Sequence, residues 1–318
     1  MSRSNVLFRW SLSLTALTLP VTLAALVAFL CIHAWPAFHY NGLHFLTHND
    51  WNLGSQYGNP VTVNGTQVLP GASYGILFLI AGTGLSSIIA LVLAVPIGLG
   101  AALFLSEAVP GPMRDSIALF VELLASVPSV VFGLWGYVVL IPLMAHHVYP
   151  HMASLLSGIP FFGPPTYSGY GLLTSGLVLT LMIVPLITAN LREAATATPA
   201  QVREAARAMG ATGFEVVIKV LIPRLRRPLI GVSTLALGRA LGETMAVLMV
   251  SGNALGYVPN NIYSPISTMA AFIVSQLDSA LQDPTGMAVY SLTEIGLVLL
   301  VLSLLVNGAA RLLLRGQA

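Results

Sequence analysis

Charged residues are scarce in this sequence of 318 residues, where Asp, Glu, Lys and Arg make up only 8%. A soluble globular domain carries roughly 25% charged residues, so water is not the main solvent of this chain. The only cysteine, Cys31, excludes an internal disulfide framework and a cysteine metal site within the chain. The only lysine, Lys219, does not belong to a Gly-x-x-x-x-Gly-Lys-Ser/Thr pattern, so the chain cannot bind ATP through a P-loop. We therefore expect no cofactor in this chain.

Apolar residues are abundant instead, at 56% of the sequence, and they gather in long runs. A helix needs about 20 residues to cross a bilayer. The runs that are long enough lie at residues 12–32, 74–105, 117–144, 171–191, 229–250 and 288–312. We predict an all-α fold, a polytopic membrane helical bundle of six transmembrane helices, with kinks at Pro96 and Pro128.

The first apolar run predicts a retained helix, because it is long and no small-residue cleavage pattern follows it. A polar segment comes next, and its turn pairs predict an external loop: Asn41-Gly42, Asn59-Pro60, Asn64-Gly65 and Pro70-Gly71. We therefore divide the chain into residues 1–73, a transmembrane helix with an external loop, and residues 74–318. The second part is a core of five transmembrane helices with a cytoplasmic loop at 192–228.

Lysine and arginine are confined to one side of this topology. The cations on that side are Arg3, Arg9, Arg114, Arg192, Arg203, Arg207, Lys219, Arg224, Arg226, Arg227, Arg311 and Arg315. Since Lys- and Arg-rich loops stay in the cytoplasm, both termini are predicted to be cytoplasmic. The chain is predicted to be a multi-pass protein of a bacterial inner membrane. Arg239 alone is left inside the membrane.

All seven histidines fall in the predicted external segments. His146, His147 and His151 are close enough in sequence to suggest a metal site. Because no carboxylate or cysteine accompanies them in that loop, solvated histidines are the commoner explanation. We predict no metal site.

The cytoplasmic loop carries the signals of two short helices. Thr198-Pro199-Ala200-Gln201 and Thr212-Gly213-Phe214-Glu215 each fit a capping box, in which a side chain and a backbone N–H bond reciprocally. Gly210 is placed to end the first helix. We expect two helices joined by a glycine turn and bounded by Pro223 and Pro228. An amphipathic helix lying on anionic lipid is an alternative.

Two ionisable residues lie near the middle of the fifth predicted span. Arg239 is ten residues into the run, roughly 15 Å along a helix and near the bilayer midplane. Glu243 is one turn further, where an i, i+4 spacing would let the two charges partly neutralise each other. Intramembrane charges mark a pathway or substrate site by default, although a structural ion pair is the alternative. Glu122 and Glu294 are predicted to make either a helix contact or part of a pathway.

Three segments carry a family resemblance. Glu204-Ala205-Ala206, then Gly210, then residues 220–223 resemble the EAA loop of ABC importer permeases. Residues 236–247, ALGRALGETMAV, and residues 122–136, ELLASVPSVVFGLWG, resemble signatures of the Pst phosphate permeases of the C type. The resemblance covers most of residues 82–253.

This resemblance implies a fold like that of type I ABC importer permeases and a role in inorganic phosphate import. It implies that Arg239 and Glu243 serve phosphate passage, and that the short cytoplasmic helix docks on a separate ATPase. The expected docking residues are Arg203, Glu204, Ala205, Ala206 and Gly210.

The implied partners are a second, PstA-like permease, a dimer of PstB-like ATP-binding subunits and a periplasmic PstS-like phosphate-binding protein. Membrane lipid surrounds the chain, and no nucleic acid partner is expected. An importer of another oxyanion, such as molybdate or sulfate, remains an alternative. So does a stand-alone channel or secondary transporter.

Overall fold

The computed structural model describes residues 3–55, 57–63, 65–156, 158–164 and 168–315. The described part is helical, with short strands in one loop. Its α-helices are α1 (Arg3–Asn41), α2 (His44–Thr47), α3 (Leu77–Glu107), α4 (Gly111–Ala125), α5 (Ser129–Trp135), α6 (Ile141–Leu143), α7 (Tyr149–Leu155), α8 (Leu172–Thr196), α9 (Ala200–Ala208), α10 (Gly213–Val216), α11 (Ile222–Leu241), α12 (Met245–Val250), α13 (Met269–Ala280) and α14 (Met287–Arg315).

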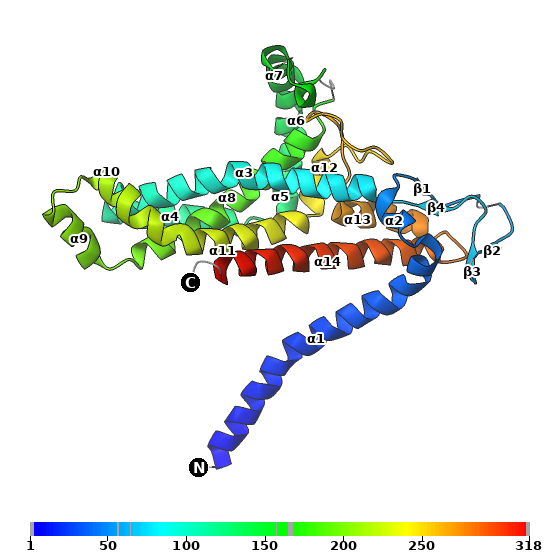
Figure 1. Ribbon diagram of the computed structural model, residues 1–318, viewed down its shortest axis with the longest axis horizontal. Helices are drawn as coiled ribbons and strands as arrows, with labels where there is room; N and C mark the ends of the chain where they lie inside the picture. The colour runs from blue at the N-terminus through cyan, green and yellow to red at the C-terminus, as the bar shows by residue number, and fades with distance from the viewer. Residues whose placement is uncertain (1–2, 56, 64, 157, 165–167, 316–318) are drawn as a thin grey trace.

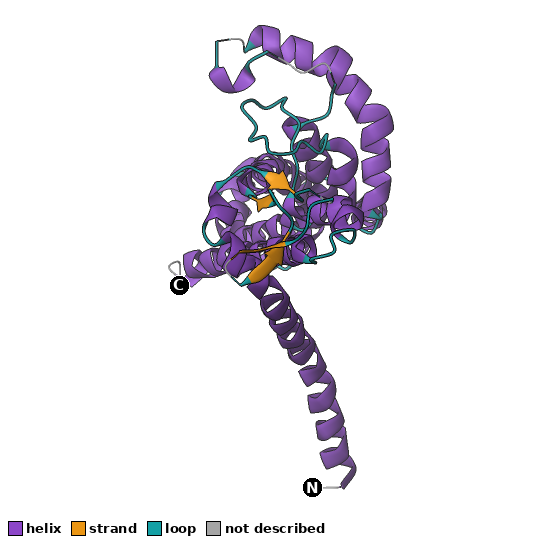
Figure 2. Cartoon of the chain, turned by 90° about the vertical axis from the view of Figure 1, so that its right-hand side faces the viewer, coloured by secondary structure: helices purple, strands orange, loops and turns teal. Residues whose placement is uncertain are grey.

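Helices α3, α8, α11 and α14 run side by side along the long axis of the molecule (Figure 1). Helices α9 and α10 lie at one end of this bundle, and the strands lie at the other. The C-terminal part of helix α1 contacts α14, and its N-terminal part points away from the bundle, as both overall views show (Figures 1 and 2). None of the most apolar window of α1 is buried within the chain, so this helix presents its apolar side chains to the surroundings.

The segment after α1 is a small structured loop. Strand β1 (Trp51–Asn52) pairs antiparallel with β4 (Ser73–Tyr74), and β2 (Val61–Val63) pairs antiparallel with β3 (Thr66–Val68). Gly42, Gly65 and Gly71 have φ angles of 53°, 79° and 78°, which glycine tolerates without strain. The turns predicted at these glycines are confirmed, while Asn64 lies outside the described residues.

The prediction of a continuous third span over 117–144 was wrong. Helix α4 ends at Ala125, and a new helical segment begins at Ser129 and continues to Leu155. Proline lacks an N–H and disfavours the helical conformation of the residue before it. Pro128 therefore separates two helices, where the sequence predicted only a kink.

The fifth predicted span, 229–250, was also wrong in its bounds. The helix begins before the predicted span and runs without a loop from α10 through a π turn, 217–221, into α11. The predicted boundaries at Pro223 and Pro228 therefore do not exist. At the other end, α11 stops at Leu241 and α12 begins at Met245. Five helices of the described part are apolar and long enough to cross a membrane, and the interrupted α11–α12 pair makes the sixth crossing.

Three π turns, 136–140, 144–148 and 217–221, share a local cause. Each ends two residues before a proline, namely Pro142, Pro150 and Pro223. A proline in a helix removes one hydrogen bond, and its ring clashes with the carbonyl of residue i−4. A π turn widens the helix ahead of the ring. The chain thus keeps three prolines inside helical segments without breaking them.

Helices α3 and α8 pack closely because small residues line their contact. Ala90 and Ala94 are fully buried on α3. A Cβ on Gly98 would come within 2.6 Å of Ile187 Cγ2, and one on Gly176 within 2.6 Å of Ile89 Cγ2. In a membrane, where lipid removes most of the hydrophobic drive for helix association, such close backbone approach supplies the packing energy.

We predict that Gly98→Leu separates α3 from α8 and lowers the yield of folded protein, because overpacking a tight contact costs about 1–3 kcal/mol or more. The measurement is the monodisperse fraction in detergent by size-exclusion chromatography. Gly100→Leu is the matched control, since Gly100 lies on the same helix and nothing lies within 4 Å of the position that its Cβ would take. Equal yields for the two variants would contradict this packing argument.

Candidate functional site

The break between α11 and α12 lies directly beside the charged pair predicted from the sequence. Gly242 caps the C-terminus of α11, and Glu243 and Thr244 connect it to α12. The Glu243 Oε1 atom accepts a hydrogen bond from the backbone N–H of Ala246 at 3.2 Å. This carboxylate thus satisfies a free N–H at the start of α12, where negative charge is also favoured by the helix dipole.

The ion pair between Arg239 and Glu243, which the sequence left open as the alternative to a pathway role, is not among the ion pairs of the described residues. An i, i+4 contact requires an unbroken helix, and α11 ends at Leu241. Within the described ranges no carboxylate lies at ion-pair distance from Arg239. Among the described residues Arg239 therefore has no counter-ion, while Glu243 acts as a helix cap.

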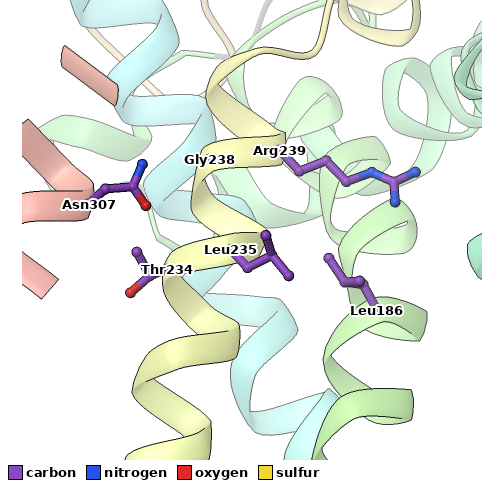
Figure 3. Close-up of a pocket in the computed structure, with 6 residues that line it drawn as sticks. All are labelled: Leu186, Thr234, Leu235, Gly238, Arg239 and Asn307. Carbon is purple, nitrogen blue, oxygen red and sulfur yellow. The ribbon is translucent and has the colours of Figure 1, made fainter. Parts of the chain in front are cut away.

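Arg239 lines a hollow of about 380 Å³ on the surface of α11. Helix α8 contributes Leu186 on one side and α14 contributes Asn307 on the other (Figure 3). The Arg239 side chain extends toward the α8 side and is partly buried. The remaining lining residues all belong to α11 and are Thr234, Leu235 and Gly238. A guanidinium fork in such a hollow suits the oxygens of a tetrahedral anion.

The segment between α8 and α11 folds as two helices, α9 and α10, joined at Gly210, as predicted. Gly210 has a φ of 88°, a conformation that favours glycine. The capping box at Thr212 is confirmed, with Thr212 and Glu215 bonded reciprocally. Hydrogen bonds from Lys219 and Thr212 lower the pKa of Glu215 to about 2, so this carboxylate stays ionised at neutral pH.

The other predicted capping box, at Thr198, was wrong. Helix α9 begins at Ala200 with Pro199 as its N-cap, and no side chain caps it. Pro199 adopts ψ of 137°, which places it outside the helix. The three-residue spacing from Thr198 to Gln201 is therefore out of register with the helix start.

The residues predicted to dock on an ATPase divide between two faces of α9. Glu204, Ala205 and Gly210 are exposed, whereas Ala206 is buried against the chain itself. Two exposed apolar residues extend the outer face, Met209 at 85% and Phe214 at 73% of full exposure. Neither residue was predicted from the sequence, although large apolar residues in an otherwise polar loop are a signal that could have found them.

Arg203 binds within its own chain. Its Nε lies 3.2 Å from Glu107 Oε1, and its Nη2 donates to the carbonyl of Ala195 at 2.7 Å. The Nε and Oε1 atoms are shielded from solvent and lie at ion-pair distance without the alignment of a hydrogen bond. Arg207 approaches the other oxygen of Glu107 at 3.8 Å. Glu107 is the last residue of α3, so α9 is attached to the ends of both α3 and α8.

Glu122 and Glu294 both make contacts between helices. Glu122 on α4 forms an ion pair with Arg192 on α8 at 2.8 Å. Glu294 on α14 is buried and accepts a hydrogen bond from Asn41 on α1 at 3.0 Å. Neither contributes to the hollow at Arg239. A pathway role for either residue stays a prediction.

The histidines of the predicted external segments make local contacts. His44 and His48 stack with ring centroids 3.3 Å apart, and His151 Nδ1 lies 2.6 Å from the carbonyl oxygen of His147. In the part of the chain that the structure describes, no group of three His, Cys, Asp or Glu side chains could hold a metal ion.

Comparisons with known proteins identify the family of the chain. Residues 94–317 match the family described as binding-protein-dependent transport system inner membrane component. The phosphate transport system permease protein PstC 1 of Mycobacterium tuberculosis is 44% identical over 98% of this chain and 94% of its own length. The phosphate transport system permease protein PstC of Pasteurella multocida is 37% identical over 98% of this chain and 91% of its own.

Solved structures share the fold. A chain of a bacterial alginate ABC transporter superposes with a TM-score of 0.62 at 15% identity, covering 98% of this chain and 97% of that one. A chain of the MetNI methionine ABC transporter gives a TM-score of 0.53 at 18% identity, covering 76% of this chain and 97% of that one.

We predict that Glu107→Gln loosens α9 from the bundle. Neutralising Glu107 removes its attraction to Arg203 and Arg207, and each kcal/mol so lost raises the locally open population about fivefold. Trypsin should therefore cut faster after Arg203 and Arg207, as measured by mass spectrometry of the fragments.

The control for this variant is Glu193→Gln. Glu193 is exposed near the same end of α8, and no ion pair involving it occurs in the described ranges. Cleavage after Arg203 at the wild-type rate in Glu107→Gln would show that the contact does not hold the helix.

Proposed function

The chain belongs to the family of binding-protein-dependent transport system inner membrane components, and we propose that it is the permease subunit of an ATP-driven importer of inorganic phosphate. A second permease of similar fold, two ATP-binding subunits and a periplasmic phosphate-binding protein complete the complex. ATP is bound and hydrolysed on the separate subunits. The relatives named as phosphate permeases support the substrate, because the likeness to them extends over almost the whole chain.

The observation that carries the proposal is the unpaired charge of Arg239. A cation within a membrane span costs at least about 2.5–3.5 kcal/mol, and no carboxylate in the described ranges offsets it. A passing anion removes that cost for as long as it stays. Arginine keeps its proton and presents a planar fork of donors, so it can bind two phosphate oxygens at once.

The continuous helix from α10 to α11 gives the importer its coupling path. Movement of an ATPase against α9 and α10 would be delivered through the π turn at 217–221 to Leu241, where the helix stops beside Arg239. The exposed face with Glu204, Met209 and Phe214 is the docking face. Alternating access then consists of rocking the two permeases, so that Arg239 faces first outward and then inward.

We expect Arg239→Gln to abolish most phosphate uptake while the complex still assembles, because the amide keeps a donor but loses the charge. Removing a charged hydrogen-bonding partner of the anion costs about 1.5–3 kcal/mol, or about 10- to 100-fold in rate. The measurement is uptake of radioactive phosphate per assembled complex in a strain that lacks the chromosomal gene. Arg192→Gln, which removes the charge of an arginine outside the hollow at Arg239, is the control.

The double variant Arg239→Gln with Glu243→Gln separates transport from scaffolding. Glutamine retains an acceptor oxygen for the Ala246 N–H, so the cap survives and the double variant should transport no better than Arg239→Gln alone. Recovery of uptake in the double variant would mean that the two charges only stabilise each other, and the assignment of Arg239 would fail.

We also propose that both termini and α9 lie in the cytoplasm and that the strands lie outside, on the basis of the arginine distribution. In a Cys31→Ser background, Tyr57→Cys should react with an impermeant maleimide in intact cells and Met209→Cys only after permeabilisation. Both native residues are highly exposed, at 101% and 85%, so access does not limit the reaction. The reverse labelling pattern would invert the topology.

A further inference from the structure

One face of α11 continues from the hollow at Arg239 to the cytoplasmic end of the helix. Residues three or four apart lie on the same side of a helix, and this spacing links Arg224, Arg227, Gly231, Thr234, Leu235 and Gly238. We name this set the α11 stripe. From Arg224 to Arg239 the helix rises roughly 22 Å at 1.5 Å per residue.

Two hollows meet on the stripe. The hollow at Arg239, about 380 Å³, shares Thr234, Leu235 and Asn307 with a neighbouring hollow of about 270 Å³. Gly231 and Arg311 line the second hollow. A third hollow, about 590 Å³, opens at the cytoplasmic end and is lined by Pro223, Arg224, Arg226 and Arg227.

Glycine keeps the stripe open. Nothing lies within 4 Å of the position that a Cβ would take on Gly231 or Gly238, so neither glycine is required for packing inside this chain. Both have ordinary helical conformations, so the glycines are not needed for the backbone either. What they provide is space along the helix surface.

The charges along this surface have one sign. Arg239 lies at one end, Arg311 of α14 lies beside Gly231, and Arg224 lies at the other end. In the ranges that the structure covers, no carboxylate is at ion-pair distance from any of these three arginines. Asn307 uses one of its amide hydrogens on the carbonyl of Ser303, which leaves a second donor.

We propose that the α11 stripe, with Asn307 and Arg311 of α14, is the route by which inorganic phosphate leaves Arg239 for the cytoplasm. The proposal rests on the proposed function and extends it from one residue to a path. Phosphate passes from Arg239 to Arg311 and then to Arg224 at the mouth.

Because the arginines are spaced along the α11 stripe, they suit stepwise release of phosphate better than tight binding at one place. Conduction requires each site to bind well enough to admit an ion and weakly enough to let it go, and several sites in series satisfy both conditions. Leu235, 57% exposed, and the glycines add no negative charge to the wall between the arginines, and no carboxylate lines either hollow. A single arginine without a successor would hold the anion instead.

The first test fills the path. Gly231→Leu should lower phosphate uptake by about tenfold or more in proteoliposomes that contain the whole complex, because the side chain occupies the hollow between Arg239 and Arg311. Gly100→Leu is the matched control, since Gly100 is an exposed glycine of a membrane helix with the same free space. Uptake by Gly231→Leu at the wild-type rate would overturn the proposal.

A second variant guards against failed assembly. In a Cys31→Ser background, Thr234→Cys is assembled first and then modified from the cytoplasmic side with an anionic methanethiosulfonate. We expect modification to stop uptake, free phosphate to slow the modification, and the same reagent to leave Gly100→Cys active. Lack of reaction at Thr234→Cys in the assembled complex would show that a partner helix or lipid fills the stripe, and would overturn the proposal.

The third test addresses the charge. Arg311→Gln should slow phosphate uptake about tenfold, and Arg311→Lys should recover much of it, because the step from Arg239 needs a cation at this place. Equal uptake by the two variants would overturn the path.

The wild-type complex separates the two proposals: no phosphate uptake at all would refute the proposed function, whereas normal wild-type uptake with unaffected stripe variants would refute only this route.

Discussion

The free energy of keeping one guanidinium charge within a membrane constrains much of this molecule. Arg239 has no counter-ion in the described part of the chain, so its charge must be met by water, by a partner or by a passing anion. The neighbouring break at Gly242 ends α11 and brings backbone carbonyls and N–H groups out of helical hydrogen bonding. Irregular backbone at membrane depth is tolerated only where it is buried in protein or lines a cavity. The open charge and the broken helix therefore support the same interpretation of this surface as part of a pathway.

Helices α9 and α10 are held in place by contacts with the rest of the chain. Glu107 connects Arg203 and Arg207 of α9 to the end of α3, and Ala195 of α8 accepts a further bond from Arg203. The capping box and the Glu215–Lys219 pair secure α10, from which the helix continues into the membrane. The exposed apolar residues Met209 and Phe214 therefore lie on a segment that contacts the ends of α3 and α8 and continues into α11.

Most local features were predicted correctly from the sequence, apart from the capping box at Thr198, whereas contacts between distant segments were not. The turn at Gly210 and the box at Thr212 depend on a few adjacent residues, and both were predicted correctly from the sequence. Hydropathy located the membrane helices but not their interruptions, since Pro128 and Gly242 leave average hydropathy almost unchanged. The pairing of Arg239 with Glu243 failed because it assumed an unbroken helix. Glu107 could not have been found, because its partners lie far along the chain and only the fold brings them together.

The π turn ahead of Pro223 sets the rotational phase of the helix that carries Arg239. One extra residue in a turn rotates everything beyond it by about 100° relative to an uninterrupted α-helix. The direction in which Arg239 points, relative to α9 and α10, therefore depends on the π turn at residues 217–221. Helix periodicity counted straight through these five residues assigns the wrong side to every residue beyond them. By inducing this π turn, Pro223 determines which side of α11 each later residue occupies, including Arg239.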